Sequence, residues 1–333
     1  MKISILSAAL LAGFGLSLGT AQTAPAAEPL NVVVTIKPVH SLASAVMQGA
    51  GEPQLLIDGA GSPHSYAMKP SQARRLNSAD IIIRVSETLE TFLEKPIASL
   101  SSQAKIITLA EIPGLKLLPV REGGAFDEHG HEHEDEHEHG AEHPDHAAAS
   151  EEHDHAHEQE GHDSHLWLNP ANAAAIADHL VLAFAEARPE MADIFTANAK
   201  ALKARLDELD TSLRRTLAPL KGKPFIVFHD AYQYFEDAYG VPAAGSVTLS
   251  PERQIGAARL QEIRRKIGEA SAACVFSEPQ FTPKLLATIT EGTDARTGVL
   301  DPLGADLPSG SEQYFQLMTN LATNLTQCLS GPS

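Results

Sequence analysis

Basic residues are scarce in this chain of 333 residues: 25 Lys and Arg face 43 Asp and Glu, and the formal net charge is −18. Binding to nucleic acid or to an anionic lipid surface depends on clustered Lys and Arg, so the composition argues against both partners. Long apolar runs are lacking after residue 27, which argues against a later membrane-spanning helix. Hydrophobic residues still make up 43% of the chain, enough for folded cores.

Motifs that supply an enzymatic nucleophile or cradle a nucleotide phosphate are lacking as well. The chain has no credible Gly-x-Ser-x-Gly elbow and no P-loop. The stretch His133-Glu134-Asp-Glu-His137 formally matches the HExxH zinc-protease pattern, but it lies in a biased His/acid repeat where such matches arise by chance. We therefore expect a protein that is not an enzyme. A zinc hydrolase is the alternative, and it would need an open coordination position and a general base.

The first 27 residues have the pattern of a secretory signal peptide. Lys2 supplies a positive start, residues 3–18 form an apolar run, and Gly19-Thr20-Ala21 offers a small-residue cleavage site. A membrane anchor is the alternative, but the run is short and no basic segment follows it. No Cys stands near the cleavage region, so a lipoprotein is not expected. The predicted location is the bacterial periplasm, as a soluble protein.

Cysteine is limited to two residues, Cys274 and Cys328. An even number of Cys in an exported chain favours one disulfide, and two buried free thiols are the alternative. Cys274 falls on a predicted strand and Cys328 on a predicted terminal helix, so a bond between them would join that helix to its sheet.

Buried-strand runs alternate with helical segments in both halves of the chain, as in α/β proteins with parallel sheets. We predict two such lobes, an N-terminal lobe over residues 28–188 and a C-terminal lobe over residues 220–333. Between them, residues 189–219 are predicted as a linking helix about 40 Å long. Apolar residues recur in that segment at helical spacing: Phe195, Leu202, Leu206, Leu209 and Leu213.

The segment 122–163 interrupts this rhythm. It holds 16 Asp and Glu and no Lys or Arg, so it carries −16 of the formal charge of −18 and leaves −2 for the rest of the chain. Its composition cannot bury a core, and we expect it to be disordered. A solvated acidic linker is one interpretation, and a weak multi-site metal collector is the favoured one. The candidate auxiliary ligands are His129, His131, His133, His137, His139, His143, His146, His153, His155, His157 and His162.

Four further candidates stand just beyond strand-like segments: His64, His165, His229 and Asp301. Ligands of α/β sheets bind outside the carboxyl ends of the strands, and each lobe contributes two candidates. Three imidazoles and a carboxylate suit a four-coordinate Zn²⁺ ion in the cleft between the lobes. Each His alone could instead be a surface or capping residue. Asp301 could instead cap the turn before Pro302.

At these residues the chain resembles the periplasmic zinc-binding receptors of bacterial ABC importers, the ZnuA type of metal-binding solute receptor. The resemblance covers essentially the whole mature chain, and a His/acid-rich insert before the second ligand is typical of the zinc branch. The matching stretches are Pro63-His64-Ser-Tyr66 with Lys69-Pro70-Ser71, His165-Leu-Trp-Leu-Asn-Pro170, Phe228-His229-Asp-Ala-Tyr232 with Tyr234-Phe235, and Leu300-Asp301-Pro-Leu-Gly304.

The resemblance implies two α/β lobes joined by a rigid long helix, with the metal ion between them. It implies His64, His165 and His229 as the metal ligands. Manganese receptors of the family carry Glu at the third position, so His229 favours zinc. It also implies that the two Cys residues pair. Pro63 stands where some zinc receptors have an acidic ligand. The fourth ligand is therefore expected to be Asp301 or water.

The predicted function is a high-affinity periplasmic zinc receptor, a monomer that delivers Zn²⁺ to an inner-membrane ABC permease. The His-rich insert is expected to act as an auxiliary, weak zinc collector. Two alternatives are a periplasmic zinc buffer without a transporter and a manganese receptor.

Overall fold

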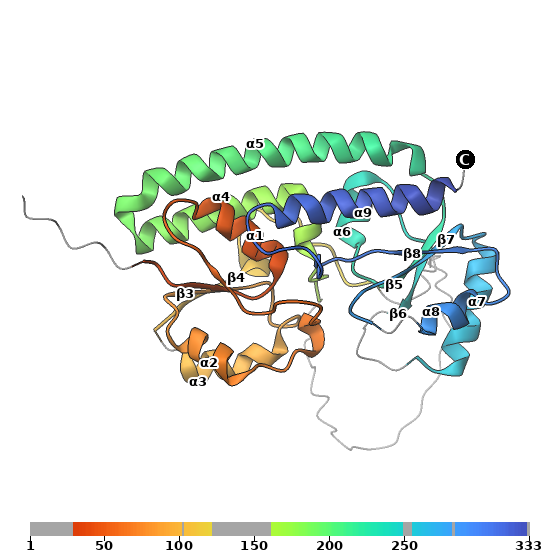
Figure 1. The fold of residues 1–333 in the computed structure, drawn as a ribbon, viewed down its shortest axis with the longest axis horizontal. Coiled ribbons are helices and arrows are strands. Elements are labelled where there is room, and N and C mark those ends of the chain that lie inside the picture. The colour runs from red at the N-terminus through yellow and green to blue at the C-terminus, as the bar shows by residue number, and fades with distance from the viewer. Residues whose placement is uncertain (1–28, 102, 122–160, 249–254, 282–283, 332–333) are drawn as a thin grey trace, which may run out of the picture.

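Two α/β lobes lie side by side in the computed structural model, which describes residues 29–101, 103–121, 161–248, 255–281 and 284–331 (Figure 1). Each lobe contains a four-stranded parallel sheet, and the two sheets share one strand order, with the second strand at an edge followed by the first, third and fourth. The N-terminal sheet comprises β1 (Val32–Val34), β2 (Gln54–Leu55), β3 (Ile81–Arg84) and β4 (Lys105–Thr108). The C-terminal sheet comprises β5 (Phe225–His229), β6 (Gly245–Thr248), β7 (Cys274–Ser277) and β8 (Arg296–Val299).

Successive side chains of each strand point to opposite faces of its sheet, and both faces are buried. This explains why the strand sequences are continuously apolar. In β1, Val32 and Val34 join the main hydrophobic core while Val33 faces a smaller cluster on the other side of the sheet. In β5, Val227 joins the main core while Ile226 faces the corresponding cluster of the second lobe. Because side chains alternate along a strand, a parallel sheet needs apolar residues at successive positions to bury both faces.

The helices cover these faces and are distributed over both lobes. They are α1 (Lys37–Val46), α2 (Pro70–Asn77), α3 (Glu94–Leu100), α4 (Pro170–Ala187), α5 (Ala192–Leu217), α6 (Gln233–Tyr239), α7 (Ala257–Glu269), α8 (Lys284–Thr290) and α9 (Gln313–Ser330). In Figure 1, α2 and α3 lie under the N-terminal sheet, and α7 and α8 lie beside the C-terminal sheet. Helices α1, α4, α5 and α9 form a layer above the two sheets.

The predicted long linking helix is confirmed. Helix α5 extends over both lobes in Figure 1 and is flanked by short 3₁₀ turns at Pro189–Met191 and Ala218–Leu220. The main hydrophobic core beneath it is continuous from the N-terminal sheet to the C-terminal one. The five apolar residues predicted to face that core are all buried: Phe195, Leu202, Leu206, Leu209 and Leu213.

Three element predictions need correction. Strand β6 was not predicted, because its sequence Gly-Ser-Val-Thr has a single aliphatic residue and its strand character comes from pairing with β5. The amphipathic pattern of residues 251–269 predicts a helix over that range, but α7 begins only at Ala257, and residues 251–254 lie outside the described residues. The sequence of residues 87–100 predicts a helix interrupted at Pro96, but the segment becomes α-helical only at Glu94. Pro96 lies in its first turn, where a missing N–H breaks no helical hydrogen bond.

The predicted disulfide is confirmed. Cys274 on β7 is bonded to Cys328 on α9, with their Cα atoms 6.2 Å apart and a sequence separation of 54. The alternative of two free thiols was therefore wrong. The bond joins the terminal helix to the C-terminal sheet and closes a long loop, which restricts the unfolded chain.

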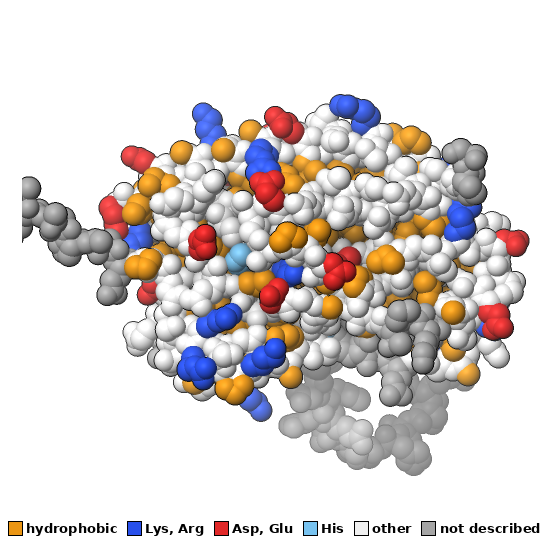
Figure 2. All heavy atoms as spheres, viewed as in Figure 1, with side chains coloured by type: hydrophobic (Ala, Val, Ile, Leu, Met, Phe, Trp, Pro, Cys, Tyr) orange, Lys and Arg blue, Asp and Glu red, His pale blue; other side chains and the backbone are white. Residues whose placement is uncertain are grey.

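Charges of both signs are interspersed on the face of the molecule shown in Figure 2. This agrees with the near-neutral balance calculated for the chain outside residues 122–163. Among the helices of the described residues, none is both long enough and apolar enough to cross a bilayer.

Replacing both cysteines by serine (C274S/C328S) is expected to lower the free energy of unfolding by about 2–4 kcal/mol, because the loop then regains its entropy in the unfolded state. Urea unfolding of the two proteins under identical conditions measures the difference. Metal stoichiometry should stay the same, since neither cysteine belongs to the histidine group described below. A loss of under about 1 kcal/mol would show that the bond contributes little.

Candidate metal centre

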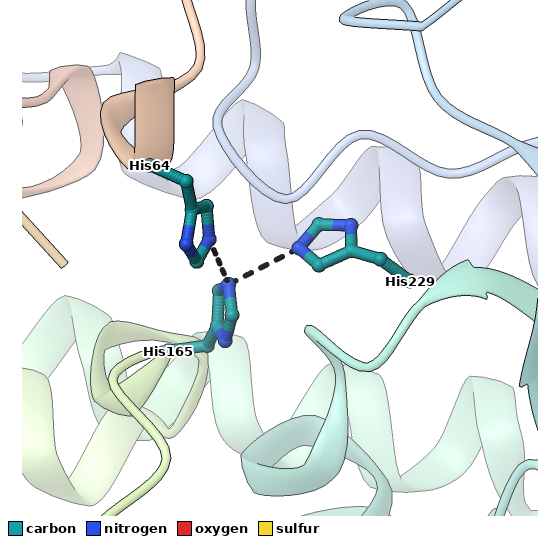
Figure 3. A group of neighbouring side chains, drawn as sticks. All are labelled: His64, His165 and His229. Carbon is teal, nitrogen blue, oxygen red and sulfur yellow. Dashed lines mark hydrogen bonds between the residues drawn. The ribbon is translucent and has the colours of Figure 1, made fainter. Parts of the chain in front are cut away.

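Three imidazoles converge between the two lobes: His64, His165 and His229 (Figure 3). Nε2 of His165 lies 3.4 Å from Nε2 of His64 and 3.3 Å from Nε2 of His229. One ligand nitrogen from each ring lies within 4.8 Å of the other two. His165 and His229 are 6% and 3% exposed, and His64 is partly buried. Three of the four residues predicted as zinc ligands are thus brought to one point.

These spacings match the dimensions of a tetrahedral zinc site. A Zn–N bond of about 2.0–2.1 Å places neighbouring ligand nitrogens about 3.3–3.4 Å apart. Two Nε2 atoms that both carry lone pairs cannot hydrogen-bond to each other, whereas both can bind one cation. The three imidazoles are therefore arranged as a pre-formed set of ligands.

Each histidine is positioned by the element that carries it. His229 is the last residue of β5, whose five residues are all buried. His64 lies in a short 3₁₀ turn that Pro63 begins, after β2. His165 immediately precedes a second 3₁₀ turn, Leu166–Leu168, whose three side chains are buried. Two of these histidines come from the first lobe and one from the second, so the group is complete only where the lobes meet.

Two buried carboxylates orient the ligand rings. Oδ1 of Asp163 lies 2.7 Å from Nδ1 of His165, and Oε1 of Glu278 lies 2.7 Å from Nδ1 of His229. Both carboxylates are buried, as are both rings. A carboxylate at Nδ1 holds the proton on that nitrogen and leaves the Nε2 lone pair for a metal ion. The geometry at His165 and His229 is that of carboxylate–histidine–metal triads.

Neither carboxylate was predicted to take part. Asp163 was counted as the last acidic residue of the insert, although its spacing of two residues from His165 is a usable signal. Glu278 directly follows strand β7, so the rule that selected the histidines at strand ends also applied to it. Strands β5 and β7 are neighbours and lie where the strand order of the sheet reverses. Ligand sites favour this position.

The protonation of His64 and of His165 is set by different surroundings. Burial, together with the nearby His165 and His229, lowers the pKa of His64 to about 2. Burial also acts to lower the pKa of His165, but the charge and hydrogen bond of Asp163 outweigh it, and that pKa is raised. Burial raises the pKa of Glu278 well above its ordinary value. His64 is therefore already neutral at neutral pH, whereas His165 holds its proton to a higher pH than an ordinary histidine, so protons compete with a metal ion more strongly at His165.

The structure does not bring Asp301 into the ligand group. Its Oδ1 accepts hydrogen bonds from Gln280 Nε2 at 2.8 Å and Leu303 N at 3.0 Å, and its Oδ2 accepts one from Ala305 N at 2.5 Å. These are the contacts of a residue that caps a turn, the alternative considered for it. The sequence pattern alone could not separate a turn-capping Asp from a ligand, because both follow a strand.

Of the auxiliary histidines in the insert, only His162 lies within the described residues. It is exposed and pairs with Pro119 in an isolated antiparallel bridge. It lines a cavity of about 180 Å³ that His64 and His165 also line. The other ten, His129 to His157, lie outside the described residues.

The base of the insert is attached to the second lobe next to the site. Arg121 Nη1 donates to Asp230 Oδ1 at 3.0 Å, and its Nη2 donates to Glu236 Oε2 at 2.6 Å. The hydroxyl of Tyr234 on α6 donates to the carbonyl oxygen of Asp163 at 2.9 Å. These contacts fix the backbone that presents His165 against the lobe that presents His229.

Hydrogen bonds between the two lobes also hold the segments around the site. Trp167, which is fully buried, donates from Nε1 to the carbonyl oxygen of Pro302 at 2.8 Å. The buried Lys37 donates from Nζ to the carbonyl oxygens of Ala305 and Leu307 at 2.6 and 2.9 Å. The cavity between the imidazoles measures about 10 Å³. Such a volume is close to that needed for one water molecule or ion.

Two parallel-sheet lobes with a histidine-lined, ion-sized cavity between them define a metal-binding solute receptor. The chain belongs to the ZnuA family, described as zinc-uptake complex component A, periplasmic, whose family pattern matches residues 32–328.

Relatives similar over nearly their whole length carry the same description. The chain is 50% identical to the high-affinity zinc uptake system protein ZnuA of Brucella suis, over 98% of this chain and 97% of that one. It is 35% identical to the protein of the same name from Yersinia pestis, over 99% and 98% of the two chains.

Solved structures support the fold. A crystal structure of ZnuA superposes with a TM-score of 0.70 at 22% identity, covering 91% of this chain and 100% of that one. The receptor FpvC from Pseudomonas aeruginosa, solved in complex with Mn²⁺, gives a TM-score of 0.72 at 17% identity over 91% and 99% of the chains. Because a receptor solved with Mn²⁺ shares the fold, the fold alone does not select the metal.

Zinc affinity is expected to fall as the pH is lowered from about 8 to about 5.5, because protons compete for the ligand nitrogens. The raised pKa of His165 places the onset of this competition above the ordinary histidine value of about 6.5. His64 is already neutral, so the logarithm of the association constant should change by about one to two per pH unit. Chelator competition at several pH values measures this slope. A slope of three would mean that all three rings bind protons in the free protein.

The variant Glu278→Gln keeps the shape of the side chain and replaces the carboxyl group at Nδ1 of His229 by an amide. Zinc binding is expected to weaken by about 10–100-fold, because the Nδ1 proton of His229 loses its carboxylate acceptor. Glu312→Gln is the matched control: it makes the same substitution at a residue paired with Arg205 outside the site. Equal zinc affinities for the two variants would rule out an orienting role for Glu278.

Proposed function

We propose that this protein is a periplasmic receptor that binds Zn²⁺ between its lobes and delivers it to an inner-membrane ABC permease. The observation that carries the proposal is the convergence of His64, His165 and His229 at the spacing of a tetrahedral zinc site. Membership of the ZnuA family and relatives named as zinc uptake proteins support the transport role.

Zinc is favoured over manganese by the chemistry of the ligands. Imidazole is a good ligand for Zn²⁺, whereas Mn²⁺ prefers carboxylate, carbonyl and water oxygens. Within the described residues, the group of side chains able to hold a metal ion consists of three imidazoles and includes no carboxylate. We therefore assign the three histidines as ligands and a water molecule as the fourth, since both oxygens of Asp301 are already engaged.

A transport role rather than catalysis is supported by the size of the cavity. The space bounded by all three imidazoles is about 10 Å³, which is enough for an ion or a water molecule. The carboxylates nearest to the ligands, Asp163 and Glu278, already accept from histidine Nδ1 atoms. Neither is placed as a free general base, so we propose that the protein is not an enzyme.

The His-rich insert is proposed to collect zinc weakly and to raise its concentration beside the site. Its imidazoles and carboxylates are suitable ligands in the absence of any selective geometry. The position of His162 supports this role, because its cavity is shared with His64 and His165. A zinc ion released from the end of the insert would therefore meet two ligands of the tight site directly.

We further propose that the protein is exported and acts as a monomer. The signal-like pattern of residues 1–27, without a Cys near the cleavage region, supports secretion to the periplasm without a lipid anchor. A zinc buffer that works without a transporter remains a second candidate. It is favoured by one observation, the many imidazoles of the insert.

The decisive experiment compares zinc binding with and without the insert. Val120 N donates to the carbonyl oxygen of Gly161 at 3.0 Å, so residues 121 and 161 can be joined by a short turn after deletion of 122–160. This deletion keeps Asp163 on His165. Chelator competition is expected to find one tight zinc site in both proteins, with the additional weak sites lost from the deletion variant.

His229→Ala in the deletion variant is expected to abolish tight binding. The substitution removes the histidine that the second lobe contributes and leaves only two histidines at the site. His179→Ala, a histidine on α4 outside the group, is the matched control and should leave the affinity unchanged. If tight binding disappears with the insert alone, the receptor proposal fails and the buffer replaces it.

A further inference from the structure

One carboxylate lies beside the metal cavity but outside the ligand group. Asp301 immediately precedes Pro302 and Leu303, both of which line the cavity with the three histidines. Its carboxylate is held by Gln280, Leu303 and Ala305, and both of its oxygens accept hydrogen bonds. Two of these three donors are backbone amides of its own turn, and the third is a side chain from the loop after β7.

Gln280 lies between Asp301 and the cavity. Its Nε2 donates to Asp301 Oδ1 at 2.8 Å, and its side chain lines the same cavity as the imidazoles. A carboxylate is an acceptor only, so the nitrogen of the amide must face Asp301 and the oxygen must face away from it. That oxygen, Oε1, is buried and has no hydrogen-bond donor among the described residues. An unpaired buried amide oxygen is unfavourable unless a bound group donates to it.

We propose that Gln280 determines the fourth coordination position of the metal site. Its amide nitrogen keeps Asp301 out of the ligand set, and its amide oxygen accepts a hydrogen bond from a water molecule bound to the ion. Gln280 is then a specificity-determining residue that does not itself bind the metal ion. This inference rests on the proposed zinc-binding function and adds the residue that keeps the ligand set free of carboxylates.

The preference for Zn²⁺ over Mn²⁺ follows from the charge and the donor atoms of the ligands. Three imidazoles and a water molecule form a neutral ligand set, which Zn²⁺ accepts well. A carboxylate in the fourth position would add a negative, oxygen ligand of the kind that Mn²⁺ prefers. Keeping Asp301 on its turn therefore disfavours Mn²⁺ more than Zn²⁺ in a fold that also occurs in a receptor solved with Mn²⁺.

The variant Gln280→Glu tests this inference, because it has nearly the same shape and places a carboxylate where the amide was. Affinities for Mn²⁺ and Zn²⁺ are measured by chelator competition on the full mature chain. The ratio of Mn²⁺ to Zn²⁺ affinity is expected to rise at least tenfold. Gln316→Glu, which adds the same charge at an exposed position of α9, is the matched control and should leave the ratio unchanged. A change of less than about twofold in both variants overturns the proposal.

A second measurement does not depend on the folding of the Gln280 variant. Co²⁺ replaces Zn²⁺ and reports its ligands through visible absorption, which is recorded for the wild-type protein and for Asp301→Asn. Identical spectra are expected, because Asp301 is not a ligand. A changed spectrum would show that Asp301 binds the ion, and the inference is then wrong. If the wild-type protein binds no zinc at the histidines, the proposed function fails instead, and the zinc titration alone reveals this.

Discussion

Three imidazoles can point their Nε2 lone pairs at one place only if the other ring nitrogens are held elsewhere. At His165 and His229 a buried carboxylate accepts the Nδ1 proton at 2.7 Å. These two hydrogen bonds decide the tautomer, the ring orientation and the direction of each lone pair. The rest of the architecture serves to bring these carboxylates and rings together, since Asp163 and His165 come from the first lobe and Glu278 and His229 from neighbouring strands of the second.

The site is pre-formed because the two lobes share one hydrophobic core. Helix α5 crosses both lobes with its buried face on that core, and Trp167 and Lys37 donate hydrogen bonds to the segment that follows β8. A hinge between the lobes would have to break this packing. Opening and closing of the site are therefore expected to involve the loops that carry His64 and His162 more than a rotation of whole lobes. The spacing of the Nε2 atoms, already that of a tetrahedral zinc site, is consistent with a rigid frame.

Metal selection then depends on a few groups around a common frame. Solved structures show the same fold in a receptor with Mn²⁺ and in ZnuA, at low sequence identity to this chain. What differs must lie in the ligand set and in the groups that orient it. In this protein the nearby carboxylates are engaged with histidine Nδ1 atoms or, at Asp301, with a turn and Gln280. The three imidazoles are left as the group able to hold a metal ion.

By itself, the sequence predicted most of the elements and the three histidines that converge between the lobes. Buried strands appear as β-branched runs, the long helix as apolar residues at helical spacing, and His64, His165 and His229 as histidines beyond strands, because these are properties of local pattern. Strand β6, the orienting Asp163 and Glu278 and the fate of Asp301 were decided only by tertiary structure. A carboxylate after a strand has the same local sequence whether it binds a metal ion, accepts from an imidazole or caps a turn. The choice depends on donors such as Gln280 Nε2 and His229 Nδ1, which folding brings from distant parts of the chain.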